Sequence, residues 1–271
     1  YQTSHMFGFL SSISPEAIKD VQIFKGHIPA KFGGRTSSVV ELSTRSGNNT
    51  SLHGSVYGNL MSSGILAEMP IFGRGSIIIN SRKSRPSNQF SEVYKSIQKF
   101  ITGDNKFNLI TETGDQNTNQ NTEYDLYSSY EDFFSRLSFI ISPKHRMTFT
   151  LVNGKDSILE ERTYYGFNNI LESDTAYIRE KNTFKNFGQS LNFYSQWNNK
   201  YRTHFSISNY SYENKYFSKQ ISPYENNNSI IGTANRFHDL SDRSIRFVQH
   251  YQNKQNHNLS IGFEENYYLL N

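Results

Sequence analysis

The chain of 271 residues contains no cysteine and no long apolar run. The missing cysteine excludes disulfide frameworks, thiolate metal sites and cysteine nucleophiles. No stretch approaches the ~20 consecutive apolar residues that a membrane-spanning helix needs. The 28 Lys and Arg residues are scattered rather than clustered, which argues against nucleic acid as a partner. The first residues lack the regions of a signal peptide, so we expect the N-terminus of an exported protein to lie upstream.

Aromatic residues are what the chain has in quantity. It contains 21 Phe and 18 Tyr, although only 35% of its residues are hydrophobic and the mean hydropathy is −0.67. A polar mean is compatible with a membrane β-barrel, because only alternate residues of each strand contact lipid. Tyrosines such as Tyr201 and Tyr251 lie near expected strand ends, where they suit a headgroup boundary, although Tyr is also common in strands generally.

From Leu52 onward we expect nine strands joined alternately by short turns and long polar connections. The short joints are 72–75, 143–146, 198–201 and 253–257. The long connections are expected at 83–131, 155–186 and 213–242. Transmembrane β-barrels show this asymmetry, because their turns are short on one side of the membrane and their loops are long on the other.

Most of the expected strands alternate between an apolar and a polar face. In one of them, Phe133, Leu137 and Phe139 share a face, whereas Arg136 and Ser138 lie on the other. This division is typical of strands with lipid on one side and a polar lumen on the other. Nine strands do not close a bacterial barrel, which uses even numbers, so we expect the chain to be part of a longer polypeptide.

Residues 1–50 differ from the rest and predict a separate α+β unit, followed by barrel strands over residues 51–271. Ser14, Pro15 and Glu16 form an N-cap, a first-turn proline and an early acid, which predicts a short helix through about Asp20. A strand is expected at 21–24 and a second strand at 38–44, before a polar linker.

The run of residues 25–44 carries the strongest motif, a strand, a glycine-punctuated turn and a second strand. Its informative positions are Gly26, Pro29, Ala30, Phe32, Gly33, Gly34, Arg35, Ser37 and Ser38. Paired glycines permit positive φ and close backbone approach. The run resembles the end of the plug domain in TonB-dependent outer-membrane receptors, and residues 4–11 and 77–82 resemble other segments of the Bacteroidetes-type members. The chain departs from the family pattern at Gln22, where an acid is common, and at Phe32, where Tyr is more frequent.

This resemblance implies a fold, a location and partners. The fold is a mainly-β, antiparallel transmembrane barrel of about 22 strands that encloses an N-terminal plug. The location is the bacterial cell outer membrane, in contact with its lipid. The family imports a scarce, bulky ligand, such as a siderophore, glycan or peptide, with energy from the TonB–ExbB–ExbD complex. The segment that contacts TonB is absent from this sequence, and the resemblance leaves room for a surface lipoprotein partner.

The resemblance also implies a ligand-facing segment at the plug apex, made of His5, Met6, Phe7 and Phe9. The alternative is that Phe7 and Phe9 only pack the plug against the barrel wall.

Two other functions stay open at this point: a surface adhesin or assembly scaffold built on the same barrel, and an outer-membrane enzyme. The eight His show no paired metal-ligand spacing, and no nucleophile-elbow pattern occurs, so we expect no catalytic site, cofactor or metal. His250 and His257 could approach each other across a turn, but without a third ligand they are expected to be bystanders. Asp239 with Asp242, and Glu123 with Asp125, are expected to be solvated loop acids.

Overall fold

The computed structural model describes residues 4–5, 10–11, 13–26, 28–29, 31–32, 37–59, 61–85, 122–165, 175–224, 228–252 and 258–270. Over these residues the chain forms one nine-stranded antiparallel sheet and two small two-stranded sheets. Across the same ranges, no helix has the length and apolar character needed to cross a membrane.

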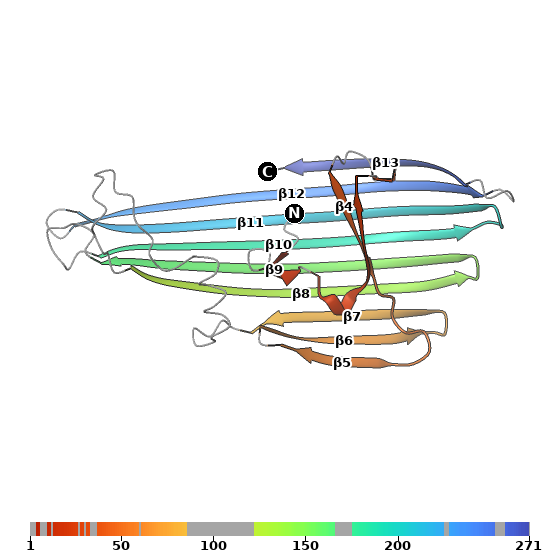
Figure 1. Cartoon of the computed structure of the whole chain (residues 1–271), viewed down its shortest axis with the longest axis horizontal. Helices are drawn as coiled ribbons and strands as arrows, with labels where there is room; N and C mark the ends of the chain where they lie inside the picture. The colour runs from red at the N-terminus through yellow and green to blue at the C-terminus, as the bar shows by residue number, and fades with distance from the viewer. Residues whose placement is uncertain are drawn as a thin grey trace.

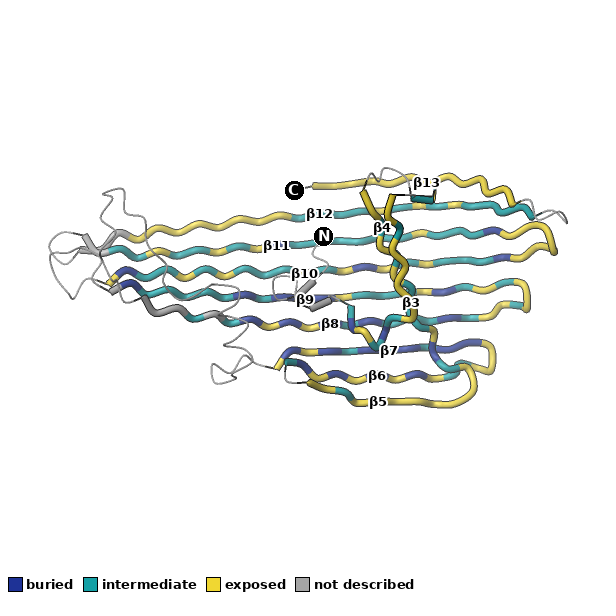
Figure 2. The backbone as a smooth tube through the Cα atoms, in the orientation of Figure 1, coloured by how far each residue is buried: buried dark blue, intermediate teal, exposed yellow. Residues whose placement is uncertain are grey.

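The large sheet contains nine strands that pair in chain order, each with the next (Figure 1). The strands are β5 (His53–Gly58), β6 (Ser62–Ile71), β7 (Gly75–Ser84), β8 (Thr122–Ser142), β9 (His145–Tyr165), β10 (Thr175–Gln196), β11 (Tyr201–Tyr224), β12 (Asn228–Gln252) and β13 (Asn258–Leu270). The expected mainly-β fold with nine antiparallel strands is therefore confirmed. The sheet has β5 at one edge and β13 at the other, and both are largely exposed (Figure 2).

Three of the four short joints lie where the sequence predicts them. Phe72 and Gly73 form the first turn with positive φ values of 47° and 64°. Residues 143–144 form the second turn. The third is stabilised by Asn198, whose Oδ1 accepts hydrogen bonds from the backbone N–H groups of Lys200 at 2.8 Å and Tyr201 at 3.0 Å. The fourth joint, at 253–257, lies outside the described residues.

Two of the long connections were predicted wrongly, because much of their length is strand. Within the expected connection 155–186, β9 continues to Tyr165 and β10 begins at Thr175, and within 213–242, β11 continues to Tyr224 and β12 begins at Asn228. The extensions carry polar and apolar residues on both faces, with Ile158 buried on one of them, so they lack the regular alternation that reveals a strand in a sequence. Asp239 and Asp242, expected in a loop, accordingly lie within β12. The third connection, 83–131, is also strand at its ends, because β7 reaches Ser84 and β8 begins at Thr122, so Glu123 and Asp125, expected in a loop, lie within β8. Residues 86–121, with the amphipathic helix expected near residues 90–101, lie outside the described residues.

The strands of the large sheet align their apolar side chains on one face, here called the outer face. Two neighbouring rows of register partners, the apolar band, run across it. One row contains Ile77, Leu137, Phe149, Leu191, Ile207 and Ile245, and the other contains Phe139, Met147, Phe193, Phe205, Phe247 and Phe263. Further from the short turns, a charged row crosses the same face through Lys83, Glu131, Lys155, Lys185, Glu213 and Asp239.

The opposite, inner face is polar and is covered in part by a small hairpin. β3 (Ile18–Lys25) pairs with β4 (Ser38–Thr44), and this hairpin crosses the strands of the large sheet (Figure 1). β1 (Ser4–His5) and β2 (Leu10–Ser11) form the other small sheet. The hairpin and the large sheet are thus separate sheets, and the division of the chain near residue 50 into two domains stays a prediction.

The helix expected from Ser14 to about Asp20 is shorter than predicted. Only η2 (Pro15–Ala17), a single 3₁₀ turn, forms, and Ile18 is already extended with φ −89° and ψ 133°. Short isolated helices are marginal, and β-branched residues such as Val21 favour a strand. Pairing with β4 therefore extends β3 back to Ile18, opposite Thr44.

Candidate functional site

The segment after β4 is joined to the inner face of the large sheet by an arginine. Arg45 Nη2 donates to Glu68 Oε1 of β6 at 2.7 Å, and the Glu68 side chain is only 9% exposed. Arg45 also holds the 3₁₀ turn, because its Nη1 donates to the carbonyl of Glu16 at 3.2 Å and its backbone N–H to that of Ala17 at 2.9 Å. Arg45 therefore connects the 3₁₀ turn and the segment after β4 to the large sheet.

Two further arginines, from distant strands, reach the hairpin from the inner face. Arg136 of β8 donates to the carbonyl oxygen of Thr44 at 3.2 Å and to its Oγ1 at 2.8 Å. Arg246 of β12 donates to the carbonyl oxygen of Lys31 at 3.1 Å. The hairpin is thereby held from both halves of the sheet.

A small apolar core and a chain of hydrogen bonds also hold the 3₁₀ turn against the large sheet. Ala17 packs in a buried cluster with Leu66, Ile78 and Phe134 of the sheet. Beside it, Ser14 Oγ lies 3.0 Å from Tyr57 Oη, which in turn accepts a hydrogen bond of 2.9 Å from Asn80 Nδ2. Polar groups buried here are thus paired, as burial requires.

The segment between β4 and β5 passes very close to β7. At Gly47, an added Cβ would lie 2.4 Å from the carbonyl oxygen of Ile77. Real Cβ atoms essentially never come this close to another heavy atom. Glycine is required at this position because the two backbones are in contact.

The motif residues that the structure describes have structural roles. Gly26 has φ 77°, which favours glycine. Phe32 packs against Phe24, with ring centroids 5.6 Å apart, and Ser38 pairs with Lys25 at the start of β4. Pro29 and Ser37 lie in the segment between the strands. Ala30, Gly33, Gly34 and Arg35 lie outside the described residues.

The predicted ligand-facing residues are placed only in part. His5 lies in β1, opposite Leu10 of β2. Met6, Phe7 and Phe9 lie outside the described residues, so their role in binding stays a prediction.

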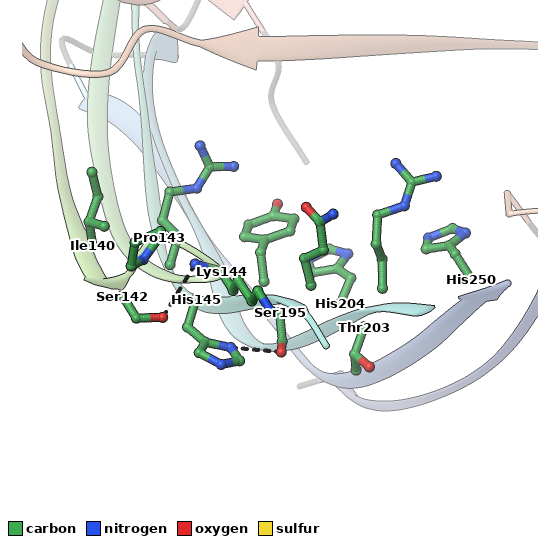
Figure 3. A pocket seen from close by; sticks show the side chains of 13 residues that line it. Ile140, Ser142, Pro143, Lys144, His145, Ser195, Thr203, His204 and His250 are labelled. Carbon is green, nitrogen blue, oxygen red and sulfur yellow. Dashed lines mark hydrogen bonds between the residues drawn. The ribbon is translucent and has the colours of Figure 1, made fainter. Parts of the chain in front are cut away.

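A pocket of about 540 Å³ opens on the sheet near the short turns (Figure 3). Its lining includes Lys144, Arg146, Tyr194, Arg202, His204 and His250. In Figure 3, His204 and His250 project from one side of the sheet, whereas His145 and Thr203 project from the other. Among the described residues that line it there is no Asp or Glu.

Planar side chains on three neighbouring strands are stacked within this pocket. The rings of Tyr194 and His204 are parallel to within 7°, with centroids 4.3 Å apart. The guanidinium carbon of Arg146 lies 5.1 Å from the centre of the Tyr194 ring. Sequence reasoning missed this group, because cations scattered along the chain converge only through the strand register. The available signal was that Arg146, Arg202 and His250 all fall on the polar faces of their strands.

A second polar group lies at the end of the sheet remote from the short turns. Glu160 and Glu180 are register partners, and Arg162 donates to both, at 2.6 and 3.2 Å. Tyr216 Oη donates to Glu180 as well, and this hydrogen bond to a carboxylate raises the pKa of the phenol. The group links β9, β10 and β11 through hydrogen bonds between their side chains, and its single arginine balances one of its two carboxylates.

The described residues offer little for catalysis or metal binding. No group of three potential metal ligands occurs among them. On the outer face, His145 Nδ1 lies 2.8 Å from Ser195 Oγ, but Ser195 is only 3% exposed and is poorly accessible as a nucleophile. His250 contacts Ser260 at 2.8 Å, and its expected neighbour His257 lies outside the described part of the chain.

Comparison with known proteins gives one distant likeness. No protein-family model matches the chain, and no curated protein is similar to it in sequence. Among solved structures, the copper transporter OprC is similar with a TM-score of 0.38 and 7% sequence identity, over 98% of this chain and 50% of that one. The present chain thus spans half of that structure. A likeness this distant supports no statement about ligand or activity.

Proposed function

We propose that this chain is the plug end and the first wall strands of an outer-membrane transporter that takes up a bulky ligand with energy from TonB. The observation that supports it most is the division of the large sheet into an outer face with a continuous apolar band and a polar inner face that carries the β3–β4 hairpin. In a wide barrel the outward rows contact lipid, and the lumen is filled by a plug.

Exposure on the outer face is the physical reason for placing this protein in a membrane. Ile207, Ile245 and Phe247 are 43%, 47% and 44% exposed, side by side on neighbouring strands. Soluble proteins rarely expose contiguous apolar patches larger than a few hundred Å². In a bilayer, lipid covers these side chains, so no apolar area is left exposed to water. The charged row lies outside the apolar band, nearer the water.

The hairpin supports the transport part of the proposal. Apart from the small apolar cluster around Ala17, its anchors are polar and partly accessible to water: the side chain of Arg45 is 43% exposed. Contacts of this kind hold a closed state and can be released without unfolding the wall. A force from the periplasm, transmitted by TonB, would act on this unit and open a path for the ligand. In this proposal His5, Met6, Phe7 and Phe9 contact the ligand before it enters.

Growth tests this function most directly. A deletion strain, grown on single carbon or iron sources, is expected to fail on the source that supplies the ligand, and the wild-type gene is expected to restore growth. The same failure is expected in a strain without the TonB complex. The H5A/F7A variant, at normal abundance, is expected to reduce uptake, and unchanged uptake would remove these residues from the ligand site.

The same experiment separates the import function from the adhesin or scaffold function. Normal growth of the deletion strain on every source, together with loss of cell-surface attachment, would contradict import and support adhesion.

A further inference from the structure

The pocket near the short turns concentrates positive charge without a compensating carboxylate. Lys144, Arg146 and Arg202 all line it, and in the described chain none of them pairs with an Asp or Glu side chain. We propose that this pocket binds a small oxyanion with two or more charges, whose carboxylate or phosphate groups are held by Arg146 and Arg202.

The arginines have the chemistry for this ligand. A guanidinium presents several N–H donors in a rigid fork that matches a carboxylate or a phosphate, and such charge-assisted hydrogen bonds are about twice as strong as neutral ones. Arg202 uses one nitrogen, Nη2, to donate to Gln252 at 3.2 Å. The guanidinium of Arg146 lies against the Tyr194 ring. This contact orients the guanidinium plane and leaves its N–H donors available for an anion.

The surroundings of the arginines are already ordered. Tyr194 and His204 stack on each other, and His204 Nε2 contacts Asn192 Oδ1 at 3.2 Å. His250 is fixed by Ser260 at 2.8 Å, and it is the register partner of Arg202. Because these side chains are held before any ligand arrives, less conformational entropy is lost when an anion binds.

The site is next to the hairpin but does not depend on it. Arg246 reaches Lys31 of the hairpin and is the register partner of Ser206, two residues from His204. An anion in the pocket would therefore lie on the inner face, close to the point where the hairpin contacts β12. This inference goes beyond import, and it is tested by binding alone, so the two proposals can fail separately.

Calorimetry of the full-length protein in detergent at low ionic strength tests the site. The probes are pyrophosphate, for a phosphate ligand, and citrate, for a carboxylate ligand. We expect saturable binding of at least one probe to the wild type. The R146Q/R202Q variant is expected to bind it at least about tenfold more weakly, because two charge-assisted contacts are lost.

The matched control is K181Q/K219Q, which removes the same charge from β10 and β11 at the far end of the sheet and is expected to bind like the wild type. If the double arginine variant does not fold, R146Q alone is expected to weaken binding at least about threefold. Absence of saturable binding of both probes to the folded wild type would overturn the proposal. Equal weakening by the arginine variants and by the control would also overturn it, since binding would then depend only on net charge.

Discussion

Arg45 Nη2 lies 2.7 Å from Glu68 Oε1, and this ion pair joins the segment after β4 to the inner face of β6. Glu68 is nearly buried, so removal of its partner leaves a carboxylate with reduced solvation. The substitution R45A is therefore expected to destabilise the folded protein by about 1–3 kcal/mol. Urea unfolding of the full-length protein in detergent measures this.

The control for Arg45 is an ion pair exposed on the hairpin itself. Lys31 and Glu41 are 44% and 34% exposed and lie 2.8 Å apart. The substitution K31A is expected to cost at most about 1 kcal/mol, because water screens such pairs. Equal losses in R45A and K31A would contradict the anchoring role of Arg45.

Two glycines give a matched test of the linker's path. G47A places a methyl group against the backbone of Ile77, whereas the nearest atom to a Cβ at Gly54 is 3.7 Å away. G47A is expected to cost about 1–3 kcal/mol through overpacking, and G54A to stay within about 0.5 kcal/mol. The midpoint of urea unfolding reports both, and a G47A variant as stable as G54A would refute the close approach.

The stability of the protein is expected to depend on pH through Glu213, which lies outside the apolar band. Its pKa is lowered from the ordinary 4.5, chiefly by the hydrogen bond from Lys185 and further by Lys215. Because the folded-state pKa lies below the unfolded one, the stabilisation is fully present above about pH 4.5 and is lost as the pH falls through the folded value. The melting temperature of E213Q is thus expected to lie below that of the wild type at pH 7, with the difference closing in acid. A constant difference at all pH values would contradict this linkage.

A charge placed on each face of the large sheet distinguishes lipid from water. Phe247 lies in the apolar band, between Phe205 and Phe263, whereas Asn266 lies on the inner face, opposite Ser244. F247R is expected to destabilise the protein by about 2–4 kcal/mol in lipid vesicles, and N266R by much less. Folding equilibria in vesicles measure the free energy of unfolding of both variants. If the two substitutions cost the same, Phe247 does not contact lipid.

The number of strands, their turns and their faces could be predicted from the sequence, because each depends on local patterns. Asn198 indicates a tight turn, because its side chain can accept hydrogen bonds from the backbone of the turn. Phe205 and Ile207 are two residues apart, which places both on one apolar face of a strand. The length of β11 could not be predicted. Beyond Asn209 it is held by cross-strand pairs such as Lys185 with Glu213, whose partners lie far apart in sequence.

The pocket was equally hidden from sequence reasoning. Arg146, Tyr194 and His204 lie on three different strands, and only the register brings them together. The short helix was predicted wrongly for a related reason. Its local cap at Ser14 was outweighed by pairing of Ile18 with a strand that begins twenty residues later in the chain, at Ser38.

The most direct test of the account is to measure which face of β11 contacts lipid. These 271 residues have no native cysteine, so single cysteines can be placed at positions 203–208 of the full-length protein, in a background without other cysteines, and spin-labelled in vesicles. Labels at Phe205 and Ile207 are expected to be accessible to oxygen in the bilayer and protected from a water-soluble relaxation agent, with the reverse at His204 and Ser206. Uniform access of the water-soluble agent along these positions would contradict a membrane wall and the transport function built on it.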